Sequence, residues 1–347
     1  IEGWGAAAKQ RLLELMARYN VPYSVEKDER DGKVEFTKQF LGVVIDGLNE
    51  EMRISAARLD KMLGKLKDAK DRSFMLRSEF ASLVGLLSFA ASCAPASRTF
   101  MKRMFRALRV SHGRFLRLDR GLKADLAFWV RFAPTQNGKS LMLEAEWSEA
   151  EELRFWTDAS LDGYGAAFQL PSGAWEYFGG LWSEFGVDTS EMHISQLEML
   201  AAAMAFDTWG SHLSKRRVIT RCDNESSVYT INALSSGKGA TTDAGMLVVA
   251  REIFFICAKH SFMTRSRHIG TKLNVLADAA SRADWKRFFE FAKSEFGVDK
   301  AQMRRVEPTL DTREMLLKIR KAMATERRMV EEKRRAAAQG RGSGRRG

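Results

Sequence analysis

The sequence is poor in cysteine and has no long apolar run, and both absences narrow what the protein can be. Its three cysteines, Cys93, Cys222 and Cys257, form no Cys-x-x-Cys pair and no even set, which argues against a disulfide framework and a structural zinc and favours a reducing compartment. No apolar stretch reaches the roughly 20 residues that cross a bilayer. The chain does not open with a basic-then-apolar signal peptide. We therefore expect an intracellular protein, in cytoplasm or nucleus, without a membrane partner.

The length and the charge set further limits. With 347 residues and 45% hydrophobic residues, the chain can form two domains with extensions. Because it begins with Ile1 rather than Met, we expect it to be a piece of a longer polypeptide. Its formal net charge is +12, and 14 basic against 6 acidic residues lie between Met303 and Gly347. Such a tail favours nucleic acid or an acidic membrane surface as partner, and a solubilising, partly disordered tail is the alternative.

The first half of the chain reads as mostly helical. Residues 1–20 carry a broad apolar face that Pro22 ends, and residues 35–46 predict two strands around a turn at Gly42. Residues 134–138 read as a loop. Four further helical patterns precede that loop: residues 54–66, 78–91, 98–109 and 125–132.

The pattern changes to strands and helices after residue 150. Short apolar runs between turn residues predict five strands: residues 153–158, 164–170, 174–180, 218–223 and 262–268. Helical patterns lie between and after them: residues 194–209, 224–234, 242–259 and 274–282. Three strands followed by helices that alternate with two more strands predict an α/β domain with a mixed five-stranded sheet and flanking helices.

Four carboxylates stand at special places in this second half. Asp158 lies in the first strand, Glu198 in an apolar helix, Asp223 at the end of the fourth strand, and Asp278 near the start of a helix. Two Mg²⁺ ions about 3.5–4 Å apart repel each other, so several anionic oxygens must surround them. Converging carboxylates are how proteins hold two such ions for phosphodiester hydrolysis.

The order of these acids and the residues around them resemble the ribonuclease H family. Residues 157–160 with 163–166 look like its first hairpin, and residues 268–270 with Asn274 and Ala277-Asp278 look like the form found in retroelement polyproteins. The run Ala-Asp-Ala-Ala-Ser-Arg at 277–282 is closest to DIRS- and Ngaro-type retrotransposons, with Ala280 in place of the usual leucine.

The residues before 150 resemble the end of a reverse transcriptase. Phe40–Asp46 is similar to the hairpin that follows the polymerase palm, Lys27 to a lysine just before it, and residues 125–129 with Asn137-Gly138 to a connecting segment. The sequence has no Tyr-x-Asp-Asp motif, so we expect the polymerase palm and fingers to be an upstream partner in the same polyprotein. The resemblance implies three parts: palm end, thumb and connection to 150, a ribonuclease H-like domain over 151–290, and a basic extension over 291–347.

The resemblance also implies roles for the acids. Asp158 would be the ligand shared by two Mg²⁺ ions, with Mn²⁺ as a substitute; Glu198 and Asp223 would complete one site and Asp278 the other. His268 would assist water activation or product release. From the residues alone, His268 is equally well a surface loop residue, and Glu198 equally the third position of a capping box that Ser195 begins. Trp156, Trp175, Trp182 and Trp209 read as core residues.

The expected function is cleavage of the RNA strand of RNA:DNA hybrids. The alternative is a non-catalytic, nucleic-acid-binding remnant of a retroelement polymerase, and a transposase- or resolvase-like nuclease of the same fold is a third candidate. Intact acids favour the first. We expect the hybrid to be gripped by the basic tail and by four cations spaced along one helix: Lys102, Arg103, Arg106 and Arg109.

Overall fold

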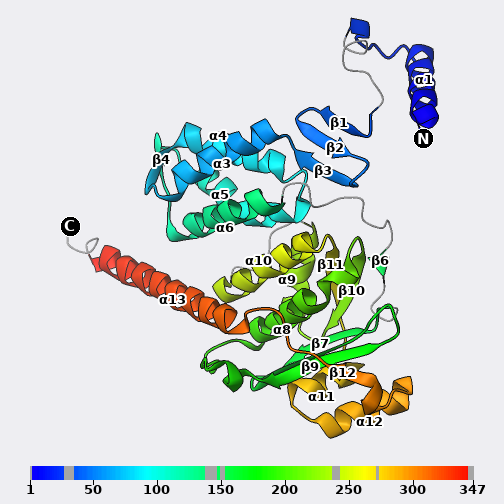
Figure 1. Ribbon diagram of the computed structural model, residues 1–347. Coiled ribbons are helices and arrows are strands. Elements are labelled where there is room, and N and C mark those ends of the chain that lie inside the picture. The colour runs from blue at the N-terminus through cyan, green and yellow to red at the C-terminus, as the bar shows by residue number, and fades with distance from the viewer. Residues whose placement is uncertain are drawn as a thin grey trace.

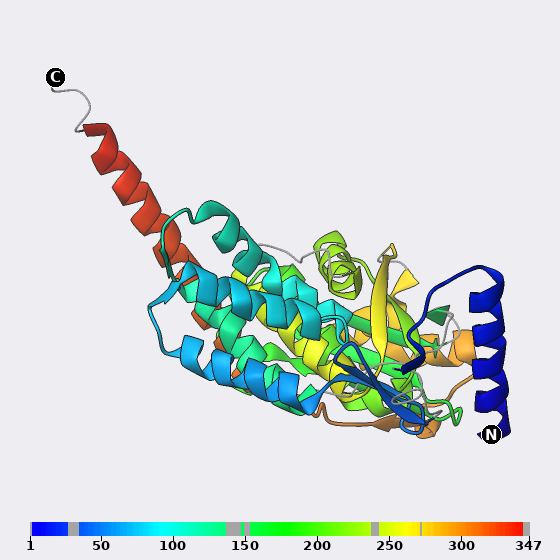
Figure 2. The same cartoon turned by 90° about the horizontal axis from the view of Figure 1, so that it is seen from above.

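The computed structural model describes residues 2–26, 35–136, 147–148, 153–236, 243–270 and 273–342. The chain forms a mixed α/β structure with several sheets, in which a mostly helical first part lies beside an α/β second part (Figure 1). Helix α1 (Glu2–Arg18) stands apart from both. The two ends of the chain lie at opposite ends of the molecule, as the view from above also shows (Figure 2). Lys27 and residues 137–138, which carry part of the resemblance to reverse transcriptases, fall outside the described residues.

The strand-turn-strand predicted around Gly42 is confirmed. Strands β1 (Thr37–Phe40) and β2 (Val43–Asp46) pair antiparallel, and β3 (Glu51–Ile54) adds a third strand. Leu41 and Gly42 both have positive φ, of 50° and 86°. The atoms nearest to a Cβ on Gly42 would belong to the flexible end of the Arg58 side chain, which can move, so the positive φ is what favours glycine at this turn.

A helical block follows the hairpin. Helices α3 (Ala56–Lys70) and α4 (Arg77–Ala90) pack with α5 (Lys102–Val110) and α6 (Arg120–Gln136), and a 3₁₀ helix η1 (Pro95–Met101) precedes α5. Strands β4 (Phe74–Leu76) and β5 (Phe115–Arg117) form a small antiparallel pair at its end. The loop predicted over residues 134–138 is wrong for residues 134–136, because Pro134 lies inside α6 and that helix ends at Gln136. The fully buried side chains of the block come from all four helices: Leu66, Phe80, Leu83, Leu87, Met104 and Leu126.

The α/β part contains two adjoining sheets. Strands β7 (Phe155–Ala159), β8 (Gly163–Gln169) and β9 (Trp175–Leu181) form an antiparallel meander, and β10 (Arg217–Cys222) pairs in parallel with β11 (Met263–His268). The short β6 (Trp147–Ser148) pairs with β10 on its other side. Strand β10 approaches β7, so the sheet of order β12-β9-β8-β7 adjoins the sheet of order β11-β10-β6. The five strands predicted from the sequence are present, while their union in one continuous five-stranded sheet remains a prediction.

Helices cover both faces of these sheets. Helices α8 (Ile194–Trp209), α9 (Glu225–Ser236) and α10 (Ala244–Lys259) lie on the face toward the helical block, and α11 (Val275–Ser281) and α12 (Trp285–Phe296) lie on the other (Figure 1). Short 3₁₀ helices η2 (Trp182–Phe185) and η3 (Gly210–Leu213) follow β9 and α8. The prediction of a core role for the four tryptophans is confirmed, since each is at most 8% exposed.

The segment after residue 297 adds to the α/β part. After the 3₁₀ helix η5 (Lys300–Gln302), strand β12 (Met303–Arg305) pairs in parallel with β9. Helix α13 (Thr312–Gly342) begins against α10 and α8, where Met315, Leu316 and Ile319 are buried, and then extends away from the body (Figures 1 and 2). The division into three parts at residues 150 and 290 stays a prediction, and β12 lies in the part that was assigned to the extension.

Helices α6 and α10 join the helical block to the α/β part. The Asp125 carboxylate of α6, 3% exposed, accepts a hydrogen bond from Arg251 of α10. Glu252 accepts from both terminal nitrogens of Arg131 at 3.2 and 3.3 Å. Rings from both sides pack between these ion pairs: Phe100, Phe128, Phe132, Phe254 and Phe255. In the described part of the chain, no helix is both long enough and apolar enough to cross a bilayer.

Candidate metal and catalytic site

The four predicted acids come together where β7, β10, α8 and α11 meet. Asp158 lies on β7 and Asp223 directly follows β10, while Glu198 projects from α8 and Asp278 from α11. The negative charges of Asp223 and Asp278 both raise the pKa of Asp158, and those of Asp223 and Asp158 raise the pKa of Glu198. Four carboxylates from four elements therefore share one electrostatic environment.

Both oxygens of the Asp158 carboxylate accept hydrogen bonds from side chains. Its Oδ2 accepts a 2.6 Å hydrogen bond from Ser281 Oγ, and its Oδ1 accepts one of 3.3 Å from Asn274 Nδ2. Burial raises the pKa of Asp158 to about 7, and the neighbouring carboxylates add to this while the Ser281 hydrogen bond lowers it. Asn274, fully buried, also donates to the Thr157 carbonyl at 3.1 Å. Asp158 is thus held in one orientation by two donors from the segment that carries Asp278.

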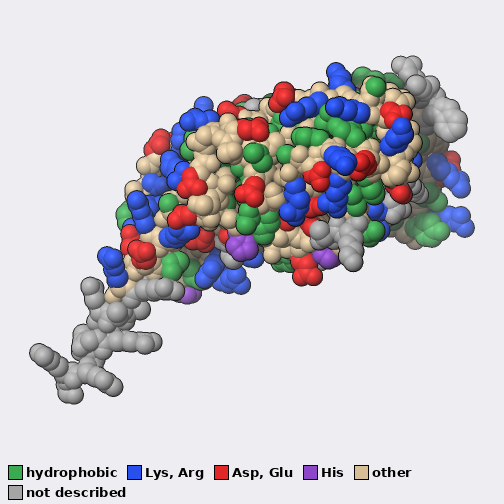
Figure 3. All heavy atoms as spheres, turned by 90° about the horizontal axis from the view of Figure 1, so that it is seen from below, with side chains coloured by type: hydrophobic (Ala, Val, Ile, Leu, Met, Phe, Trp, Pro, Cys, Tyr) green, Lys and Arg blue, Asp and Glu red, His purple; other side chains and the backbone are tan. Residues whose placement is uncertain are grey.

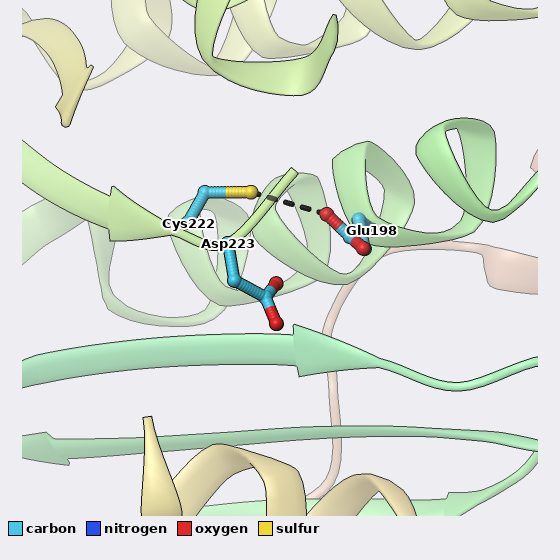
Figure 4. A group of neighbouring side chains, drawn as sticks. All are labelled: Glu198, Cys222 and Asp223. Carbon is cyan, nitrogen blue, oxygen red and sulfur yellow. Dashed lines mark hydrogen bonds between the residues drawn. The ribbon is translucent and has the colours of Figure 1, made fainter. Parts of the chain in front are cut away.

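Glu198 faces Asp223 and the Cys222 thiol (Figure 4). Cys222 Sγ donates a hydrogen bond to Glu198 Oε2 at 3.1 Å, and ligand atoms of Glu198, Cys222 and Asp223 all lie within 4.8 Å of one another. Burial raises the pKa of Glu198 to about 8 and that of the Cys222 thiol as well, so the sulfur stays protonated and acts as a donor. Carboxylate oxygens, rather than sulfur, are therefore the ligands that this cluster offers.

The capping-box alternative for Glu198 is wrong. Helix α8 begins at Ile194, with His193 at the N-cap, and the His193 amide donates to Gln196 Oε1 at 3.2 Å. Ser195 is therefore already inside the helix. The Glu198 side chain, 8% exposed, is directed to Cys222 and Asp223 instead of to the backbone at the helix start.

Asp278 carries two arginine partners. Its Oδ1 accepts from Arg282 Nε at 2.8 Å and its Oδ2 from Arg287 Nη1 at 2.7 Å. Asp278 is 6% exposed, whereas the two arginine side chains are 59% and 47% exposed. The two guanidinium groups thus cover, from the solvent side, both oxygens of the carboxylate.

Glycines in β8 bring α11 close to the sheet. A Cβ atom on Gly165 would lie 2.5 Å from Ala280 Cβ and from the Ser281 amide nitrogen, and one on Gly163 would lie 2.4 Å from the Ser281 carbonyl oxygen. The α11 backbone therefore packs directly on β8, with Ala279 and Ala280 fully buried against it. This close approach lets Ser281 reach Asp158 on the neighbouring strand.

His268 lies at the edge of the site. His268 is the last residue of β11 and is exposed. Its ring Nε2 is 3.2 Å from the Asp223 carbonyl oxygen. The structure thus places His268 beside an acid-bearing segment, where it can meet solvent and a bound molecule. Its assisting role remains a prediction.

The four cations predicted to bind nucleic acid differ in exposure and in their contacts. Lys102, Arg106 and Arg109 are exposed on α5. Arg103 is half-buried, and its Nη1 donates to the Gly121 carbonyl at 3.4 Å and to Asp125 at 3.5 Å. Arg103 is therefore tied to α6, while the other three face solvent.

Sequence reasoning did not assign four neighbours of the acids: Cys222, Ser281, Arg282 and Arg287. Ser281 and Arg282 belong to the run after Asp278 that carries the family resemblance, so their sequence position was a usable signal. Cys222 and Arg287 gave no such signal, because their partners are set by packing between elements.

The donor set suits a hard divalent cation. The four side chains that converge offer carboxylate oxygens, which Mg²⁺ and Mn²⁺ prefer. Burial, together with the neighbouring carboxylates, raises the pKa of Asp158 and Glu198 and so disfavours their charged forms. A bound cation would favour those forms.

Comparison with known proteins gives structural matches alone. No family model matches the chain, and no curated protein matches it. A foamy viral protease-reverse transcriptase in complex with an RNA/DNA hybrid is similar to it at 12% identity and a TM-score of 0.27, covering 67% of this chain and 29% of that one. The same kind of protein in complex with dsDNA is similar at 10% identity and a TM-score of 0.26, covering 80% and 46%. The chain spans less than half the length of each of these structures.

Proposed function

We propose that the chain cleaves the RNA strand of RNA:DNA hybrids by metal-dependent hydrolysis, as the ribonuclease H-bearing part of a retroelement reverse transcriptase. The observation that carries this proposal is the convergence of Asp158, Glu198, Asp223 and Asp278 from β7, α8, the end of β10 and α11. The resemblance of the sequence to the ribonuclease H family predicts these four acids in this chain order, on a first strand, a helix, a fourth strand and a last helix. Their meeting at one place supports it.

Asp158 would hold both metal ions, with Glu198 and Asp223 completing one site and Asp278 the other. When bound, Mg²⁺ supplies a low-pKa water and stabilises the departing 3′ oxygen. The protein's own residues orient this set: Ser281 and Asn274 fix the Asp158 carboxylate, and the Cys222 thiol fixes Glu198. His268, whose ring Nε2 lies 3.2 Å from the Asp223 carbonyl oxygen, would assist water activation or product release.

The helical block and α13 are the parts we expect to hold the hybrid, through phosphate contacts from exposed cations. In this proposal the polymerase palm and fingers are supplied by another segment of the same polyprotein. The chain by itself would then give no primer extension, which a primer-extension assay checks.

The proposal is tested by incubating the full chain with a hybrid whose RNA strand is end-labelled, with and without Mg²⁺. We expect internal cuts in the RNA of the hybrid, no cuts in single-stranded RNA or duplex DNA, and no reaction with a chelator. Asp158→Asn should lower the cleavage rate by two orders of magnitude or more, since one shared ligand is lost (about 3 kcal/mol of barrier).

Two exposed acids next to the site serve as matched controls. Asp162→Asn and Glu225→Gln remove a charge close in sequence to Asp158 and Asp223, but both side chains face solvent. They should keep near-normal cleavage. Equal loss in the controls, or full activity in Asp158→Asn, would contradict the assignment; hybrid binding without any cleavage would favour the non-catalytic remnant.

A further inference from the structure

A second candidate site lies away from the carboxylates, between the helical block and α13. A groove of about 1140 Å³ runs between α5 and α6 on one side and α10 and α13 on the other. Its lining residues come from segments more than 200 positions apart in the sequence, such as Arg106 and Lys321. None of the four converging acids lines it, so the groove and the proposed catalytic site are separate features.

The groove is rich in positive charge. Three acidic residues line it, and each is already engaged: Asp119 accepts from the Leu122 amide at 2.8 Å, Glu252 accepts from Arg131, and Glu326 accepts from the Ala244 amide at 3.2 Å. Eight basic residues line it as well: Arg103, Arg106, Arg117, Arg120, Arg131, Arg251, Lys318 and Lys321. The balance of charge along this groove is therefore strongly positive.

Among the described residues, half of these cations have no carboxylate partner. Arg103 and Arg251 bind Asp125, Arg131 binds Glu252, and Lys318 lies 2.9 Å from Glu314. Across the described parts of the chain, no carboxylate lies within 4 Å of the other four cations, which are all exposed: Arg106, Arg117, Arg120 and Lys321. Unpaired charge of one sign on facing walls repels itself, and an anionic ligand would relieve that repulsion.

Apolar side chains also line the groove. Between the cations it exposes small and aliphatic side chains, among them Ala107, Val110, Ala127, Val248 and Met329. On the underside of the molecule, Lys, Arg, Asp and Glu side chains are interspersed (Figure 3). Unpaired cations with apolar side chains between them suit a single nucleic-acid strand, whose phosphates can meet the cations and whose uncovered bases can contact the apolar side chains. A duplex would present phosphates alone and hide its bases.

We propose that this groove binds a single strand of nucleic acid, with Arg106, Arg117, Arg120 and Lys321 holding its phosphates. That the anion is a nucleic acid rests on the proposed function; that it is an anion rests on the charge of the groove. A strand seated here would tie α13 to the helical block, since Lys321 and Arg106 would contact the same backbone. The groove would then hold a single-stranded part of the bound nucleic acid away from the site of cleavage.

The test measures binding of a fluorescently labelled oligo-dT to the full chain by anisotropy over a series of salt concentrations. The triple variant Arg106→Ala, Arg117→Ala, Lys321→Ala should raise the Kd at least about tenfold at low salt. It should also reduce the salt slope by about two, from roughly 0.7 for each lost phosphate contact on a single strand. The matched control is Lys61→Ala with Lys67→Ala, two exposed α3 lysines that do not line the groove.

An unchanged Kd and slope in the triple variant would overturn the proposal, as would an equal loss in the lysine control. A labelled poly-glutamate chain that binds as tightly as oligo-dT would overturn the assignment to nucleic acid. Asp158→Asn should bind oligo-dT like the unaltered chain. Normal cleavage by Asp158→Asn would thus refute the proposed function and leave the groove standing. An unchanged Kd and salt slope in the triple variant, with cleavage lost in Asp158→Asn, would refute only the groove.

Discussion

Ser281 Oγ of α11 donates a 2.6 Å hydrogen bond to Asp158 Oδ2 of β7. The same hydroxyl lies 3.0 Å from the Asp278 carbonyl oxygen, and Asp278 is itself one of the four acids. One serine thus ties the strand that carries the first acid to the helix that carries the last. The side chains of Ser281 and Asp158 are both buried. The hydrogen bond between them therefore restricts rotation of the Asp158 carboxylate and fixes the position of its other oxygen, Oδ1.

Ser281→Ala should therefore weaken the site without removing a ligand. We expect a fall in cleavage rate of about tenfold, because Asp158 loses one of its two donors (about 1–2 kcal/mol). The Mg²⁺ concentration at half-maximal rate should rise as well, which a purely structural loss would not produce. Ser281→Thr, which keeps the hydroxyl, should restore much of the effect. Ser294→Ala on the exposed face of α12 serves as the control. If Ser281→Ala needed the same Mg²⁺ concentration for half-maximal rate as the unaltered chain, the positioning role would be contradicted.

Asp158→Asn should make the metal-free protein more stable at alkaline pH. The folded pKa of Asp158 is raised to about 7 from 3.8, so the charged form is disfavoured in the folded state. The cost is absent below the unfolded pKa, near 4, grows as the pH rises, and is complete above about pH 7, where it is on the order of 4 kcal/mol. Thermal unfolding at pH 8 and pH 5.5 in chelator should show a gain for Asp158→Asn that is larger at pH 8. Mg²⁺ should stabilise the unaltered chain and Asp162→Asn but not Asp158→Asn, and Asp162→Asn should show no gain in stability at pH 8.

Arg287→Ala should change how the chain responds to Mg²⁺. Arg282 and Arg287 occupy the oxygens of Asp278 that a metal would need, so guanidinium and metal compete. Without Arg287, the metal-free protein should unfold at a lower temperature, and the rise in Tm per increment of Mg²⁺ should be larger than in the unaltered chain. Lys286→Ala, an adjacent exposed residue whose nearest carboxylate is 4.0 Å away, should leave both quantities unchanged. A smaller Mg²⁺ response in Arg287→Ala would mean that the arginine supports metal binding rather than opposing it.

Gly165→Ala should disrupt the packing of α11 on β8. The added methyl group would meet Ala280 Cβ and the Ser281 nitrogen at 2.5 Å, which neither backbone can avoid without moving. We expect a loss of about 1–3 kcal/mol in the free energy of unfolding, and a loss of cleavage as Ser281 and Asp278 shift. Gly85→Ala in α4 is the control, because its Cβ would meet nothing within 4 Å and alanine is the better helix former. Equal stability of the two variants would show that α11 has room to move.

The sequence predicted most elements of the α/β part because their patterns are local. The apolar helix at 194–209 has the bounds of α8, and the strand patterns match β7, β8, β9, β10 and β11 to within two residues. The convergence of the four acids was also expected, since each sits at a strand or helix position that the family pattern orients inward. These features depend on periodicity and chain order, which a single sequence displays.

Other features were not predictable in this way. Strand β12 is three residues long, Met303-Arg304-Arg305, and its polar sequence gives no strand signal; it forms because the edge of β9 is available. Pro134 stays in α6 near its end, where few hydrogen bonds are lost. The partners of Asp158, Glu198 and Asp278 are contacts between segments far apart in the sequence, so they depend on packing that periodicity does not encode.

The pairing of β12 with β9 has a consequence for how the chain folds as it is made. Arg304 binds Glu176, 128 residues earlier, and β12 covers the edge of a strand that is otherwise exposed. During synthesis, β9 is made before β12, so its edge stays unpaired until residue 305 has been added. An unpaired strand edge can pair with other nascent chains. The α/β part thus reaches its final sheet only after synthesis has passed residue 305, and premature termination before that point would release a product with one unprotected edge.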